Sequence, residues 1–100
     1  MYFQTTITPV PNALTPILTP TVGKRFMVKY LTFNLSVDLF NAVEIYLGAV
    51  KIYTQAGCRA GVTCGFNLDR NYLLGDVNAV LAVRVPDTTA INVNVTYKEK

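Results

Sequence analysis

The side chains that most often carry out catalysis are nearly absent from this sequence. Histidine does not occur, and serine occurs once, as Ser36. Histidine is the usual general base and a common metal ligand, because its unperturbed pKa lies near neutrality. Without it, a small chain has few ways to build a titrating base, an activated nucleophile or a metal cage. The residue types therefore argue against an enzyme.

The six acidic residues are spread singly along the chain, and most fall in segments with turn composition. A glycosidase needs two carboxylates that face one cleft, whereas Asp in a turn usually hydrogen-bonds the backbone. No D-x-D-x-D run typical of a calcium loop occurs. We predict no catalytic residue, no metal site and no cofactor. The acidic residues are Asp38, Glu44, Asp69, Asp76, Asp87 and Glu99.

The two cysteines, Cys58 and Cys64, are separated by five residues. A C-x₅-C pair without further cysteines or any histidine cannot complete a tetrahedral zinc shell. Two interpretations stay open. Either the thiols are unlinked, one in a strand and one in a loop, or they form a disulfide across the glycine-containing turn between them.

The composition suggests that part of the surface is covered. Charged residues make up 15% of the chain and hydrophobic residues 51%, whereas an ordinary globular chain is about 25% charged. A surface rich in Thr and Asn would account for this shortage, and so would contact with other subunits; we favour the second. The net charge of +3 comes from scattered cations, so no specific nucleic-acid binding is expected.

No feature of the sequence predicts membrane insertion or export. No run approaches the 18 or so apolar residues of a membrane span. The segment from Met1 to Thr6 lacks the basic stretch and apolar core of a secretory signal. We expect a chain that is made in the cytoplasm and not exported by that route, or one whose leader has been removed.

Alternating apolar and polar residues predict strands along most of the chain. The clearest example is residues 91–97, where Ile, Val, Val and Tyr alternate with two Asn and a Thr. Loops are expected at residues 38–42, with Phe40 at the centre, and at residues 86–89. Seven or eight short strands with turns between them and no amphipathic helix predict an all-β antiparallel sandwich that is jelly-roll-like. The main expected strands are 25–37, 43–47, 50–54, 62–68, 77–85 and 91–97.

The same alternation predicts which side chains face the core and which face solvent. A hairpin is expected around Gly48, because glycine accepts the backbone angles of a tight turn. On its two strands Tyr46 and Tyr53 have outward parity, so they are candidate surface-binding aromatics. The predicted core comprises Leu31, Phe33, Leu35, Val43, Ile45, Ile52, Phe66, Leu81, Val83, Val93 and Val95.

Residues 1–21 are expected to form an extended N-terminal arm, followed by the sandwich at residues 22–100. Within the arm, the loose alternation of residues 2–8 leaves open a short strand or a plain extended segment. Four of the five prolines fall between Pro9 and Pro20, and proline favours extended backbone while removing a hydrogen-bond donor. Such a strap can lie over its own sandwich or on a neighbouring subunit, and we favour the neighbour. The candidate interface residues are Tyr2, Phe3, Leu14, Ile17 and Leu18.

Four segments of the expected sandwich carry a resemblance to a known group of proteins: Val22-Gly23-Lys24-Arg25-Phe26, Val43-Glu44-Ile45-Tyr46-Leu47-Gly48, Leu73-Leu74-Gly75-Asp76 and Ile91-Asn92-Val93-Asn94-Val95-Thr96-Tyr97. In the order and composition of these segments, residues 22–100 resemble small β-sandwich proteins of tailed-phage virions, the capsid decoration, head-fibre-base and tail-accessory proteins. The resemblance includes no diagnostic motif.

The resemblance implies a non-enzymatic structural protein of a virion, made in the host cytoplasm. Its implied partners are further copies of itself, with a trimer favoured on the resemblance alone, and a capsid or tail protein. The alternative from another class is a carbohydrate-binding module at a receptor-binding tip, because tyrosine rings stack on sugar faces. In that case Tyr46 and Tyr53 would line a shallow polar groove.

Overall fold

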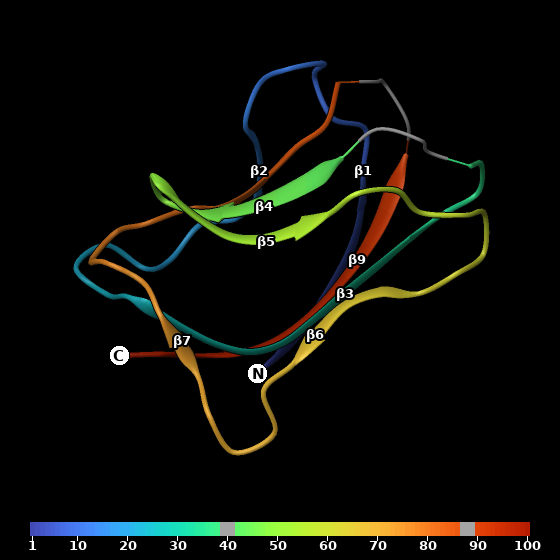
Figure 1. Ribbon diagram of the computed structural model, residues 1–100. Helices are drawn as coiled ribbons and strands as arrows, with labels where there is room; N and C mark the ends of the chain where they lie inside the picture. The colour runs from blue at the N-terminus through green and yellow to red at the C-terminus, as the bar shows by residue number, and fades with distance from the viewer. Residues whose placement is uncertain (39–41, 87–89) are drawn as a thin grey trace.

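The computed structural model describes residues 1–38, 42–86 and 90–100. Within them, nine strands form two antiparallel sheets that pack face to face (Figure 1), which confirms the predicted sandwich. The loops expected at 38–42 and 86–89 fall largely outside the described residues. The strands are β1 (Tyr2–Ile7), β2 (Thr15–Leu18), β3 (Phe26–Leu35), β4 (Val43–Leu47), β5 (Val50–Gln55), β6 (Cys64–Asn67), β7 (Leu73–Leu74), β8 (Leu81–Arg84) and β9 (Ile91–Glu99).

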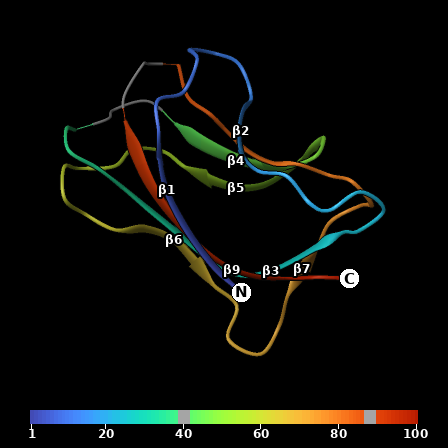
Figure 2. The same ribbon diagram turned by 180° about the vertical axis from the view of Figure 1, so that it is seen from behind.

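The order of the strands is that of a jelly roll. Sheet I runs β1-β9-β3-β6, with β7 paired to the start of β3, and sheet II runs β2-β8-β4-β5. The antiparallel pairs β1·β9, β2·β8 and β4·β5 are nested one inside the next along the chain, as in a long hairpin folded over on itself. Figure 2 shows from behind that both chain ends lie in sheet I.

The core lies between the sheets and agrees closely with the predicted core. Nine of the eleven predicted residues are buried, and Ile52 and Phe66 are half-buried against them. Burial of a large apolar side chain contributes roughly 1.5–3 kcal/mol, so this layer dominates the stability of the sandwich. The alternation also gives inward parity to three further buried residues, Leu47, Val85 and Ile91. The buried apolar residues that it does not place inward are Ile17, Phe26, Val28, Cys58 and Ala82.

A bulge in β3 reverses the expected facing of its first residues. The register with β9 shifts between Val28 and Tyr30, so that Lys29 has no partner. A bulge inserts one extra residue and therefore changes which face the following side chains occupy. Phe26 and Val28 are buried in place of Met27, although Met27 shares the odd-numbered parity of the predicted core residues Leu31, Phe33 and Leu35.

The structure corrects the prediction of a separate N-terminal arm. β1 pairs along its whole length with β9, and β2 pairs with β8. Residues 1–21 therefore belong to the sandwich, and no boundary separates them from residues 22–100. Pro16 lies within β2 because β2 is an edge strand, where a missing N–H costs no ladder bond.

The strand expected at residues 77–85 is shorter than predicted. β8 begins at Leu81, whereas residues 76–79 form a turn in which Asn78 has a φ of 66°. The Asn78 side chain accepts a hydrogen bond from the Gly23 N–H (2.7 Å), and its own N–H donates to the Lys24 carbonyl (2.8 Å). These bonds to the start of β3 replace the ladder bonds of a strand.

Candidate functional site

The five predicted interface residues do not form one surface. Ile17 is buried, and Phe3 and Leu18 are half-buried against the core. All three side chains pack against the core of their own chain, and only the outer parts of Phe3 and Leu18 remain accessible. Tyr2 and Leu14 remain exposed, at 62% and 47%. The apolar pattern identified docking residues, but most of them dock on their own sheets.

The predicted pairing of Tyr46 and Tyr53 on one outer face is wrong. The register of β4 with β5 shifts so that Ile52 has no partner, and Tyr53 lies opposite Ile45 on the inner side. There the Tyr53 ring centroid lies 6.2 Å from that of Phe33 and 5.7 Å from that of Phe66. Tyr53 therefore helps to close the sandwich where β5 meets β6, and only Tyr46 faces outward.

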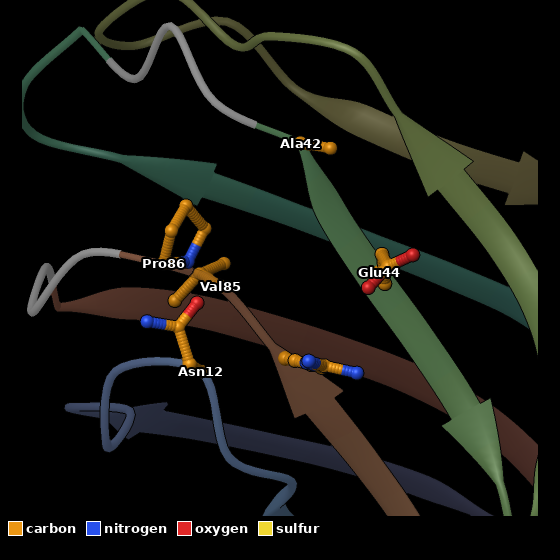
Figure 3. Close-up of a pocket in the computed structure, with 6 residues that line it drawn as sticks. Asn12, Ala42, Glu44, Val85 and Pro86 are labelled. Carbon is orange, nitrogen blue, oxygen red and sulfur yellow. The ribbon is translucent and has the colours of Figure 1, made fainter.

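A shallow groove of about 440 Å³ lies at one end of sheet II (Figure 3). Glu44 on β4 lies directly opposite Arg84 on β8, and Asn12 and Pro86 form the far side. The carboxylate of Glu44 pairs with the Lys51 ammonium at 3.2 Å. Glu44 is the single carboxylate among the described lining residues, so these residues alone supply no pair of acids for glycoside hydrolysis.

A second cleft, between β5 and β7, is apolar and small. Its volume is about 150 Å³, below the range of about 300–1,000 Å³ for small-molecule pockets. The described residues also contain no group of three or more potential metal ligands. The lining residues of the cleft are Leu47, Val50, Ile52, Leu73, Leu74, Gly75 and Asp76.

The cysteines lie together as two free thiols, with their Sγ atoms 2.8 Å apart. Cys58 is buried in the loop after β5, and Cys64 begins β6. Burial, the hydrogen bond with Cys64 and the charge of a Cys64 thiolate raise the pKa of Cys58 from 9.0 to about 12. Because the thiolate is the reactive form, Cys58 is a poor nucleophile at neutral pH.

The most unusual surface is the outer face of sheet I, most of which carries no charged residue. On β9 the fully buried Ile91, Val93 and Val95 alternate with outward Asn and Thr side chains, and the paired strands continue these rows. We call this surface the uncharged face. It consists of Tyr2, Gln4 and Thr6; Asn92, Asn94 and Thr96; Tyr30, Thr32 and Asn34; and Gly65 and Asn67.

Side-chain hydrogen bonds hold the uncharged face across three strands. Thr6 donates from its hydroxyl to Asn92 Oδ1, and the Asn92 amide donates to Asn34 Oδ1 at 2.9 Å. One row away, the Tyr2 hydroxyl donates to Asn94 Oδ1 at 2.7 Å. Bonds of this kind restrict the rotamers of exposed side chains, so the face is ordered before anything binds to it.

The uncharged face ends at the bulge in β3. Beyond Lys29 the outer surface of sheet I carries Lys98, whose Nζ lies 5.3 Å from the Tyr72 ring centroid. The outer face of sheet II is charged as well, with Glu44, Lys51 and Arg84 on adjacent strands. The absence of charge is therefore confined to one surface of the molecule.

Sequence reasoning did not identify the uncharged face, although a signal for it exists. The first charged side chain in the chain is Lys24, and none occurs from residue 88 to residue 97. These two uncharged segments include β1 and most of β9, which pair in the fold. Their separation in the chain hid the fact that they share one surface.

No protein-family model matches this chain, and no curated protein matches it. Among the described residues there is no helix of the length and apolar character needed to cross a membrane. The case for a function therefore depends on the surfaces described above.

Proposed function

We propose that this protein is a non-enzymatic structural component of a virion, which binds a capsid or tail surface as a symmetric oligomer. The observation that carries this proposal is the uncharged face. A protein that stays free in solution gains solubility from charges spread over its surface. Interfaces are depleted of Lys, Glu and Asp and enriched in Tyr, and the uncharged face has this composition.

Two further observations support the proposal. The nested strand order is that of jelly rolls, an architecture used by viral capsid and lectin domains. The sequence also resembles small virion proteins of tailed phages. The strand order and the sequence resemblance support the proposal by analogy with other proteins. The uncharged face supports it by its own chemistry.

Particle binding tests this proposal directly. Virions are purified from cells infected with the virus whose genome encodes this chain. They should contain the chain at a fixed ratio to the major capsid protein, measured by quantitative mass spectrometry. Asn94→Lys places a charge in the centre of the face and should reduce incorporation at least about tenfold, because a buried unpaired charge is costly.

Thr54→Lys is the matched control, since Thr54 is exposed on the outer face of sheet II. It adds the same charge and should leave incorporation unchanged. Absence of the chain from the particles, or equal loss with both variants, would contradict the proposal.

A carbohydrate-binding module is the second candidate, and the uncharged face favours it too. Tyr2 and Tyr30 lie on the face beside the amides of Asn94 and Asn67. Aromatic rings with neighbouring amides and hydroxyls are suited to sugars. Specific binding on a glycan array that Tyr30→Ala abolishes and Tyr46→Ala leaves intact would support this function over assembly.

A further inference from the structure

The outer edge of β1 is open and unprotected. Within the described residues, β1 pairs with β9 and with no other strand. An open edge presents unpaired backbone N–H and C=O groups, and proteins usually protect it with charges, prolines or bulges. β1 reads Tyr-Phe-Gln-Thr-Thr-Ile and has none of these. Its pairing with β9 is also continuous, without a register shift.

The hydrogen bonds identify which groups point outward. The Met1 amino group donates to the Tyr97 carbonyl (2.7 Å), and the Tyr97 N–H donates back to Met1 (2.9 Å). In an antiparallel ladder such bonded pairs alternate with unbonded ones. Phe3, Thr5 and Ile7 therefore bond to β9, whereas the backbone groups of Tyr2, Gln4 and Thr6 face the open edge.

We propose that β1 pairs with β1 of a second copy of this chain, antiparallel across a two-fold axis at Gln4. In that register Gln4 lies opposite its own symmetry mate, and Tyr2 lies opposite Thr6. Every outward N–H and C=O of the three residues then has a partner. This pairing would be one of the subunit contacts in the symmetric oligomer of the proposed function. The structural argument for it comes only from the open edge of β1.

Three features favour a second copy over another extended chain. The side-chain pairs are self-complementary, because Tyr with Thr is a favourable aromatic and β-branched cross-strand pair. No like charges meet, because the first charged side chain is Lys24. The two-fold axis also joins the uncharged faces of both copies into one continuous sheet surface. An isologous contact of this kind closes on itself and does not propagate.

The experiment is sedimentation equilibrium on the purified chain from about 5 μM to 1 mM. This range is needed because edge pairing buries less than the roughly 1,600 Å² of a standard interface. We expect a monomer–dimer equilibrium between species of 11.0 kDa and twice that mass. Gln4→Pro should abolish the dimer, since it removes the outward N–H while a proline remains tolerated on an edge.

A charge exchange at position 4 tests the register. Gln4→Lys and Gln4→Glu each place like charges opposite one another, so each should raise the dissociation constant about tenfold. Mixing the two variants should restore the dimer, because position 4 meets itself only when the axis lies at Gln4. Gln4→Val should retain the dimer, as should Thr54→Lys on the other sheet. Circular dichroism checks that each variant is folded.

Several results would overturn the inference. A monomer throughout the concentration range would do so. A dimer or trimer whose measured mass is the same for every Gln4 variant would do so as well. Failure of the mixed variants to associate would place the axis elsewhere. The measurement uses the isolated chain, so it can fail while virion incorporation succeeds, and the reverse also holds.

Discussion

The two outer faces of the sandwich differ in how they meet solvent. Sheet II presents Glu44, Lys51 and Arg84, and its ion pair joins side chains that are partly exposed. Sheet I presents uncharged side chains, among which Tyr, Thr and Asn residues bond to one another across strands. The two sheets share one core, but one has a charged outer face and the other an uncharged one. Sheet II is suited to water, whereas sheet I has the composition of the partner-binding surface that we propose.

The largest expected effect concerns the backbone of Gly65, where β6 lies close against β3 in sheet I. Gly65 has a φ of 136°, and a Cβ there would overlap the Leu31 carbonyl oxygen and lie 2.7 Å from the Thr32 Cα. Gly65→Ala must separate β6 from β3, so we expect a loss of about 4 kcal/mol or more in the free energy of unfolding. Urea denaturation measures the loss.

Gly61→Ala provides the matched control for Gly65→Ala. Gly61 also has a positive φ, 75°, but no atom lies within 4 Å of its added Cβ. It should cost only about 1 kcal/mol. Equal losses for the two variants would mean that the close approach of β3 and β6 is not what requires glycine.

The next effect separates the inner and outer sides of sheet II. Tyr53→Ala removes a ring packed between Phe33 and Phe66, so it should destabilise the protein by about 3 kcal/mol. Tyr46→Ala removes a ring from the outer face and should cost about 1 kcal/mol or less. Thermal denaturation compares them, and a larger loss for Tyr46 would contradict the bulge in β5.

A third prediction concerns the buried Cys58 thiol, in the loop where β5 of sheet II leads to β6 of sheet I. With a pKa of about 12, the Cys58 thiol should react with iodoacetamide at pH 8 at least about a hundredfold more slowly than in urea-unfolded protein. Trypsin cleaves after Arg59, so mass spectrometry resolves Cys58 and Cys64 on separate peptides. A similar rate of Cys58 modification in the folded and unfolded protein would show that the thiol is accessible and not buried.

The same pKa shift predicts how stability depends on pH. The folded state holds the Cys58 proton more tightly than the unfolded state does. The contribution of Cys58 to stability is therefore complete below about pH 9 and declines between about pH 9 and 12. Cys58→Ala should remove this part of the decline in urea denaturation measured over that range.

The smallest effects compare the polar bonds of the two faces. Asn92→Ala breaks the bonds to Thr6 and Asn34, and we expect a loss of about 1.5 kcal/mol that salt does not change. Glu44→Gln weakens the exposed pair with Lys51, so its effect should stay below about 0.5 kcal/mol and fall in high salt. Denaturation at low and high salt distinguishes them.

Local patterns predicted the strands well but could not predict their partners. The alternation in residues 91–97 and the hairpin at Gly48, whose φ is 65°, are visible in short windows of sequence. The pairing of β1 with β9 is not, because it joins segments some 90 residues apart. The prolines correctly indicated extended backbone in residues 9–20. They carried no information about which strand that backbone would pair with.

Bulges account for the errors in facing. A single unpaired residue, Lys29 in β3 and Ile52 in β5, turns the following side chains to the other side. Neither residue type marks a bulge, so the sequence offers no local signal. The candidate surface aromatic Tyr53 was misplaced for this reason, and the uncharged face was missed because it is assembled from distant strands.

Because β1 finds its partner in β9, sheet I cannot be completed until β9 has been synthesised. During translation β1 must wait, unpaired, until the residues between the two strands have emerged from the ribosome. Long-range pairing of this kind makes folding slow, and an unpaired strand is prone to aggregate while it waits. The pairing of β9 with β1 therefore completes sheet I and also ends the period in which the unpaired strand can aggregate.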